Sequence, residues 1–185
     1  KDIERLRKFQ QGKPIVEQEI NNLLLFETQS YAESPICRRK LLLNYFGEEY
    51  NQEKCGNCDN CKKTYRMMDA TELLGLMLET IHQLNEKFRS RHIVDIIKGN
   101  KTSTAISYRH NELENFGCGE DEDEATLHAI IRQALLKGYI KKDIESYGDL
   151  KLTPEGKKFM RRPIKFEVPI EVHNDDDGAD MESSV

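Results

Sequence analysis

The chain has 185 residues, 37% of them apolar and 33% charged, which is enough for one globular domain or two small ones. No apolar run approaches the roughly 20 residues of a membrane-spanning helix, and the charged start of the chain lacks a signal-peptide pattern, so we expect a cytoplasmic protein with no membrane partner. The net charge of −5 comes from residues 163–185, where seven acids and one base contribute −6. The other 162 residues have a net charge of about +1, which neither indicates nor excludes a nucleic-acid partner.

Three helices are predicted in the first 50 residues. Apolar residues recur at helical spacing within residues 1–11 and again over residues 16–24, where the preceding Pro14 suits a first helical turn. A third apolar stretch, residues 41–46, stops at Gly47, as a helix with a glycine C-cap does. A polar loop with three cysteines follows this helix.

A second group of elements is predicted from Asp69 onward. Asp69 is expected to cap a helix whose apolar face spans residues 73–84, and Ser90 is expected to cap a shorter helix that ends at Gly99. Residues 100–123 are polar and lack a clear period. They are expected to form a long loop that contains one helical turn.

The end of this group has the pattern of a helix followed by a hairpin. A helix is predicted over residues 124–138, and residues 140–144 and 150–152 have strand character, separated by the glycine-containing turn 145–149. A last short helix is expected to begin after Thr153, with proline at its first position. Three helices and then a hairpin is the element order of a winged helix.

The predicted fold is therefore mainly α with a small β-hairpin. Residues 1–66 are expected to form a helical metal-binding subdomain, and residues 67–162 a winged-helix domain. Residues 163–185 lose periodicity and become acidic, which is typical of a linker or disordered tail.

The cysteine spacing indicates a metal site. Cys37, Cys55, Cys58 and Cys61 are separated by seventeen, two and two residues, a pattern that lets four thiolates surround one structural Zn²⁺ with no open position for water. An iron–sulfur cluster takes the same ligands, and four reduced thiols without metal remain an alternative. The fifth cysteine, Cys118, has no partner at ligand spacing and is expected to be a small buried side chain.

These residues also carry a family resemblance. The segments YAESPICRR (31–39), LLNYFGE (42–48) and CGNCDNC (55–61) closely resemble the zinc-binding subdomain of RecQ helicases. The second half is similar to the winged helix of the same family at Asn85, Phe88, Ile97-Lys98-Gly99, Phe116-Gly117-Cys118-Gly119 and Leu152-Thr153. The resemblance covers residues 1–162.

The resemblance implies an ATP-dependent DNA helicase that translocates 3′ to 5′ and acts in repair and recombination. The sequence contains no G-x-x-x-x-G-K-[ST] phosphate loop, since neither Gly12-Lys13-Pro14 nor Gly99-Asn100-Lys101 fits that motif. ATP and Mg²⁺ are therefore expected only in motor domains outside these 185 residues, and the chain itself is expected to have no catalytic residue. It is expected to contact the motor domains. It is also expected to bind junctions between duplex and single-stranded DNA in the bacterial nucleoid.

Two kinds of DNA contact are predicted. Tyr147 lies in the hairpin turn, at a position where the resemblance implies an aromatic wedge that stacks on the terminal base pair. Without the resemblance, Tyr147 would be an ordinary exposed turn residue. Short donors and cations at the start of the helix predicted from Ser90 to Gly99, and around the loop after it, are candidates for phosphate contacts. They are Arg91, Lys98, Asn100, Lys101, Thr102, Ser103 and Arg109.

Two other functions are compatible with the same elements. A zinc and winged-helix transcription regulator would bind a specific DNA sequence, and a protein-docking module would use the same surfaces for a protein partner. Partners of the acidic tail cannot be predicted from the sequence.

Overall fold

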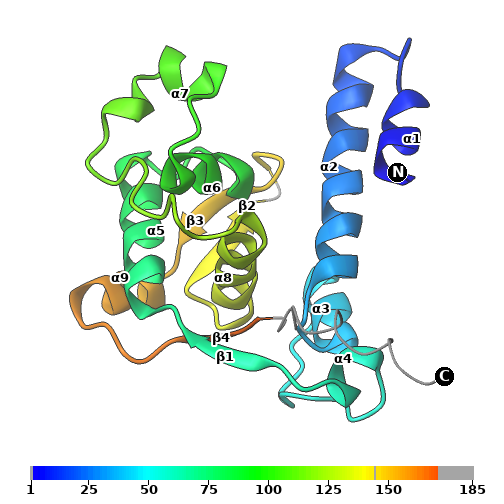
Figure 1. Cartoon of the computed structure of the whole chain (residues 1–185), viewed down its shortest axis with the longest axis vertical. Helices are drawn as coiled ribbons and strands as arrows, with labels where there is room; N and C mark the ends of the chain where they lie inside the picture. Colours follow the sequence, from blue (N-terminus) through cyan, green and yellow to red (C-terminus); the bar gives the residue numbers. More distant parts are fainter. Residues whose placement is uncertain (1, 144, 171–185) are drawn as a thin grey trace, which may run out of the picture.

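The computed structural model describes residues 2–143 and 145–170. The first half consists of helices. They are α1 (Asp2–Lys8), α2 (Ile15–Glu33), α3 (Arg38–Tyr45) and α4 (Asp59–Lys62). Figure 1 shows α1 folded back along the long helix α2, with α3 and α4 at the lower end of α2. Because Pro14 precedes α2 and Gly47 follows α3 with a φ of 80°, both helix ends agree with the sequence pattern.

The second half is a winged helix. Its elements are β1 (Arg66–Asp69), α5 (Thr71–Gln83), α6 (Ser90–Lys98), α7 (Ser103–Ser107), the 3₁₀ helix η1 (His110–Glu112), α8 (Glu124–Leu136), β2 (Ile140–Asp143), β3 (Asp149–Leu152), α9 (Pro154–Arg161) and β4 (Glu167–Ile170). Strands β2 and β3 form an antiparallel hairpin that pairs Ile140 with Leu152. The predicted fold class, a helical zinc-binding subdomain followed by a winged helix, is confirmed.

One hydrophobic core holds the winged helix together. Helices α5, α6 and α8 each bury an apolar face, and Leu74, Ile97 and Ile130 are at most 1% exposed. Leu150 of β3 and Phe166 close this core from the hairpin side and the C-terminal side. Burial of side chains of this size contributes roughly 1.5–3 kcal/mol each, so the winged helix has a core of its own.

A strand forms where the sequence predicted the start of a linker. β4 pairs antiparallel with β1, Met68 lies opposite Val168, and Phe166 is fully buried, with the Lys137 ammonium 4.9 Å from its ring centroid. The alternating apolar residues Phe166, Val168 and Ile170 are the signal for this strand. Residues 171–185, which carry most of the predicted acidic tail, lie outside the described residues.

Three local predictions are corrected by the structure. The side chain of Ser90 does not cap α6, because the residue at the cap position is Arg89. Cys118 is exposed rather than buried. Residues 100–123 contain two short helical segments, α7 and η1, where one turn was expected, and Thr102 caps α7 by accepting a hydrogen bond from the Ala105 N–H.

Helix α2 contacts the winged helix directly. The ring of Phe26 meets the ring of His128 edge-on at 5.1 Å, and Arg132 donates from Nη1 to the Ser30 hydroxyl at 2.9 Å. Lys142 of β2 forms an ion pair with Glu27. The hairpin is thereby tied to the zinc-binding half. Among the described residues, no helix combines the length and hydropathy that crossing a bilayer requires.

Candidate zinc centre and nucleic-acid interface

The structure brings the four predicted metal ligands together. Cys37 lies just before α3, Cys58 just before α4, Cys61 within α4, and Cys55 in the loop between these helices. Their four Sγ atoms all lie within 4.8 Å of one another, and those of Cys55 and Cys61 are 3.9 Å apart. Ligands at the usual Zn–S distance of about 2.3 Å in a tetrahedron would be about 3.8 Å apart. The sulfur positions therefore fit one zinc ion.

The surroundings shift the pKa values of two of these sulfurs in opposite directions. Backbone N–H groups of Asn57 and Cys58 donate to the Cys55 sulfur and lower its pKa to about 6. Burial and the neighbouring Cys58 thiol raise the pKa of Cys61 to about 11. All four sulfurs can be thiolates at this spacing only with a positive ion among them. Four thiolates around one ion suit Zn²⁺, which they would hold as a structural ion without a coordination position for water.

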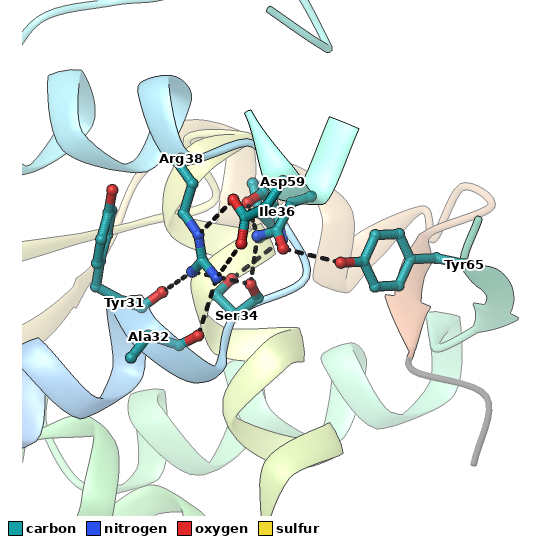
Figure 2. Close-up of polar contacts among 8 residues, drawn as sticks. Tyr31, Ala32, Ser34, Ile36, Arg38, Asp59 and Tyr65 are labelled. Carbon is teal, nitrogen blue, oxygen red and sulfur yellow. Dashed lines mark hydrogen bonds and ion pairs between the residues drawn. The ribbon is translucent and has the colours of Figure 1, made fainter. Parts of the chain in front are cut away.

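Arg38, the residue after the ligand Cys37, clamps the two ligand-bearing segments together. Figure 2 shows its guanidinium between carbonyl oxygens at the C-terminal end of α2 and the carboxylate of Asp59. Arg38 donates to the carbonyls of Tyr31, Ala32 and Ser34 and makes a two-pronged ion pair with Asp59, at 3.1 and 3.0 Å. The Arg38 partner lowers the pKa of the Asp59 carboxyl. Planar two-pronged pairing of this kind fixes geometry as well as charge.

Asn60, the residue before the ligand Cys61, makes a second clamp. Its side chain is buried, with 3% exposed, and its Nδ2 donates to the carbonyls of Ser34 and Ile36 at 2.6 and 2.7 Å. The Tyr65 hydroxyl donates to Asn60 Oδ1 at 2.9 Å. Nδ2 and Oδ1 of this amide are thus both engaged inside the fold, and these bonds hold Cys37 and Cys61 at a fixed separation.

Sequence reasoning missed this support network. A signal was present, because a polar residue adjoins each of three ligands: Arg38 after Cys37, Asp59 after Cys58, and Asn60 before Cys61. Neighbours of ligands commonly orient the ligands through hydrogen bonds. The hydrogen bonds that join the segment of Cys37 to that of Cys58 and Cys61 span 21 to 26 residues, so the pairing itself needed the fold.

The predicted wedge residue is presented to solvent at the hairpin tip. Tyr147 is 66% exposed and has a left-handed φ of 57°, followed by Gly148 with a φ of 101°. The Gly148 N–H donates to the Asp143 carbonyl, which closes the turn at 2.8 Å. A non-glycine residue with positive φ is uncommon and carries a local cost. The turn holds Tyr147 in this conformation.

The base of the hairpin is anchored to the loop before α6. The Leu150 N–H donates to the Phe88 carbonyl at 3.0 Å, and Arg89 and Asp149 form an antiparallel bridge. The Lys151 ammonium donates to the Glu86 carbonyl. Together with the ion pair of Lys142 and Glu27, these contacts restrain both strands.

The seven predicted phosphate-contacting residues fall into two groups. Arg91, Lys101, Ser103 and Arg109 are exposed around α6 and α7. The other three already have partners inside the fold. Lys98 donates to the carbonyls of Glu120 and Glu122, Asn100 donates to Asp95 at 2.9 Å, and the Thr102 hydroxyl caps α7.

The acidic run 120–124 also has a structural use. Asp123 caps α8 by accepting hydrogen bonds from the N–H and hydroxyl of Thr126, at 2.8 and 2.6 Å. Negative charge at the start of a helix is favourable to the helix dipole. The run places several carboxylates at the N-terminus of α8, where they would repel DNA phosphates.

The fold and the site define a winged-helix module joined to a structural zinc centre. Comparison with known families gives the particular one: residues 1–62 match the model described as RecQ zinc-binding, and residues 64–177 match the RQC domain. The chain belongs to the RecQ helicase family and corresponds to its C-terminal region.

Several curated relatives are similar to the chain. It is 30% identical to the ATP-dependent DNA helicase RecQ of Pasteurella multocida over 83% of this chain and 24% of that protein. It is 29% identical to the ATP-dependent DNA helicase RecQ of Haemophilus influenzae, over 75% of this chain and 23% of that protein. It is 27% identical to the ATP-dependent helicase SGS1 of Saccharomyces cerevisiae, over 75% of this chain and 10% of that protein. The chain thus spans a quarter or less of each of these relatives.

Proposed function

We propose that this chain is the DNA-gripping and strand-separating module of a RecQ-type 3′–5′ ATP-dependent DNA helicase that acts in DNA repair and recombination. The observation that carries the proposal is an exposed tyrosine at the tip of a restrained hairpin, in a winged helix of this family. ATP and Mg²⁺ would bind only in motor domains of the same polypeptide. The module would work on chromosomal DNA, in the bacterial cytoplasm and nucleoid.

Tyr147 is the proposed wedge. An aromatic ring can stack on any base, so an exposed ring suits separation that is independent of sequence, with roughly 1–3 kcal/mol for each stacked base. A wedge must also resist being pushed back by the duplex. The ion pair of Lys142 with Glu27 on one strand and the bond from Leu150 to Phe88 on the other support such stiffness.

The exposed cations on α6 and after α7 are the proposed phosphate grip. Arg91 and Arg109 are free to reach a DNA backbone, and Lys101 and Ser103 add a charge and a short donor between them. Lys98, Asn100 and Thr102 would act less directly, because their internal hydrogen bonds shape the turn that presents the others. We therefore expect backbone binding without sequence preference.

Helices α1 and α2, with the turn between them, are the proposed contact with the motor domains. Six apolar side chains of this region are 45% to 76% exposed. They are Leu6, Phe9, Ile15, Val16, Ile20 and Leu24. Exposed apolar side chains gathered in one region are typical of an interface. The match covers 24% and 23% of the two bacterial relatives, so motor domains in the rest of such a polypeptide would be the occupant.

Fluorescence anisotropy tests the proposed DNA binding. The chain is titrated onto a labelled fork, a blunt duplex of the same sequence and a single strand, each at low and at physiological salt. We expect the tightest binding to the fork and a steep loss of affinity with salt, since phosphate contacts release counterions. The double variant Arg91→Ala and Arg109→Ala should reduce the salt dependence, whereas Lys8→Ala, an exposed cation on α1, is the matched control.

The rival functions predict different results. A preference for one duplex sequence over the fork would identify a transcription regulator. Absence of binding to all three DNAs at both salts would overturn the proposal and favour a protein-docking module.

A further inference from the structure

A stack of four aromatic rings extends from the base of the hairpin to the surface beside α7. Phe88 packs against His92 and His110, with ring centroids 4.5 and 4.8 Å apart. Tyr108 lies parallel to His110, at 5.4 Å and an interplanar angle of 19°, and meets the edge of Phe88 at 5.5 Å. Tyr108 is the outermost ring and is 64% exposed.

The inner rings are fixed by hydrogen bonds. His92 is 9% exposed, and its Nε2 lies 2.8 Å from His110 Nδ1, so one imidazole donates to the other. The Phe88 carbonyl accepts from Leu150 of β3. Burial lowers the pKa of both histidines, which keeps them neutral and hydrogen-bonded at neutral pH. Tyr108 is therefore held against a rigid support that continues into the hairpin.

A large ring held in solvent on a rigid support is available to a ligand. One face of Tyr108 is covered by His110, and the 64% exposure leaves the rest of the ring open to solvent. Arg109 follows it with a left-handed φ of 57°, a conformation with a local cost. Such strain is commonly kept where a surface is shaped for binding.

The chain segment that carries Tyr108 is basic. Residues 98–110 contain Lys98, Lys101 and Arg109 and no acid, although the whole chain has a net charge of −5. Lys98 is bound to the carbonyls of Glu120 and Glu122, and Lys101 and Arg109 are exposed. Hydroxyl side chains are frequent in the same stretch, and Ile106, 55% exposed, adds apolar surface. An open aromatic face beside cations and hydroxyls is the composition of a site that binds single-stranded nucleic acid.

We propose that Tyr108 is a second stacking site, which takes an unpaired nucleobase of the DNA single strand, in addition to the wedge at Tyr147. The inference rests on the proposed DNA-binding function and deepens it. Because Phe88 connects the stack to β3, a base on Tyr108 and a base pair at the hairpin tip would be held by one continuous rigid unit. Tyr108 would thereby hold a separated base after the wedge has opened the pair.

The test uses the whole chain and forks that carry 2-aminopurine at successive positions of the unpaired arms. Stacking on a tyrosine ring quenches 2-aminopurine, so wild type should quench it at one or two neighbouring positions. Tyr108→Ala should abolish this quenching and weaken binding of an unpaired arm about tenfold, the lower part of the range for one stacked base. Tyr108→Phe, which keeps the ring, should stay within twofold of wild type.

Two controls separate stacking from general loss of surface. Ile106→Ala removes exposed apolar surface from the same segment without removing a ring, and Tyr45→Ala removes a 59% exposed tyrosine from α3. Both should leave quenching and affinity unchanged. An equal loss in Ile106→Ala, or unchanged quenching in Tyr108→Ala, would overturn the second site while leaving the proposed function intact. If wild type binds no unpaired arm and no fork, the proposed function fails together with it.

Discussion

Replacement of Asn60 by alanine should weaken zinc binding although Asn60 is not a ligand. The amide of Asn60 donates to the Ser34 and Ile36 carbonyls and accepts from the Tyr65 hydroxyl, with 3% of the residue exposed. Each net hydrogen bond is worth roughly 0.5–1.5 kcal/mol, and a buried partner left unpaired costs about 1–3 kcal/mol. Water can enter part of the space left by the amide and bind some of its former partners. We therefore expect a total loss of about 2–3 kcal/mol in the free energy that holds the site together.

The zinc centre should bear most of this loss, because the amide joins the segment of Cys37 to that of Cys61. At 1.4 kcal/mol for each factor of ten, the expected loss corresponds to roughly 30- to 150-fold weaker zinc binding. Competition with a chromophoric chelator at pH 7.5 measures this directly. Asn57→Ala is the matched control, since Asn57 lies between Cys55 and Cys58, is exposed, and makes no side-chain hydrogen bond with any described residue.

Three outcomes would refute this reasoning. Zinc binding by Asn60→Ala within threefold of wild type would show that the amide does not position the ligands. An equal loss in Asn57→Ala would show that the loop responds to any substitution. A loss of thermal stability without a loss of zinc affinity would place the effect in the fold alone.

Three further predictions follow from the fold. The pKa of His128 is lowered to about 4 by burial and by Arg132 and Arg91 nearby, so the unfolded chain gains this proton near pH 6.5 and the folded chain only near pH 4. The contribution of this residue to the free energy of unfolding is complete above pH 6.5 and falls by about 3 kcal/mol towards pH 4. In urea unfolding of zinc-loaded protein, the free energy of unfolding of His128→Gln should fall less with decreasing pH than that of wild type. An equal fall in both proteins would contradict the prediction. Phe166→Ala should destabilise the winged helix by about 3–5 kcal/mol in urea unfolding, and a cost under 1 kcal/mol would mean that the C-terminal strand is not part of the core. Removal of zinc with a chelator should expose amides around α3 and α4 to hydrogen exchange while those of α5 and α8 stay protected. The reason is that the buried cluster of the winged helix contains no residue of the zinc-binding half. Uniform exchange in both halves would contradict this prediction.

The sequence predicts features whose causes are local. Two-residue cysteine gaps bring Cys55, Cys58 and Cys61 into one turn, so the zinc site could be predicted from spacing. The position of Tyr147 in the hairpin turn followed from the neighbouring Gly148 and from strand propensity on both sides. Helices with an apolar face and a glycine end were predicted for the same reason.

Features that depend on distant partners could not be predicted. β4 pairs with a strand about 100 residues earlier, and its short apolar alternation adjoins an acidic stretch that resembles a linker. The exposure of Cys118 depends on how the loop crosses α6, where Gly119 donates to the Ile97 carbonyl. The charge of Lys98 suggested a phosphate contact. Its ammonium instead donates to two carbonyls that lie 22 and 24 residues away in the sequence, which only the fold reveals.

The measurement that tests the central claim most directly is the opening of the base pairs at a fork junction, followed by imino-proton NMR with saturating protein. If Tyr147 is a wedge, wild type should remove the imino signal of the junction pair and leave interior pairs intact. Tyr147→Ala should restore that signal while its affinity for the fork stays within about fivefold of wild type, and Tyr147→Phe should behave as wild type. An intact junction signal with bound wild-type protein, or its loss in Tyr147→Ala as well, would contradict strand separation by this hairpin.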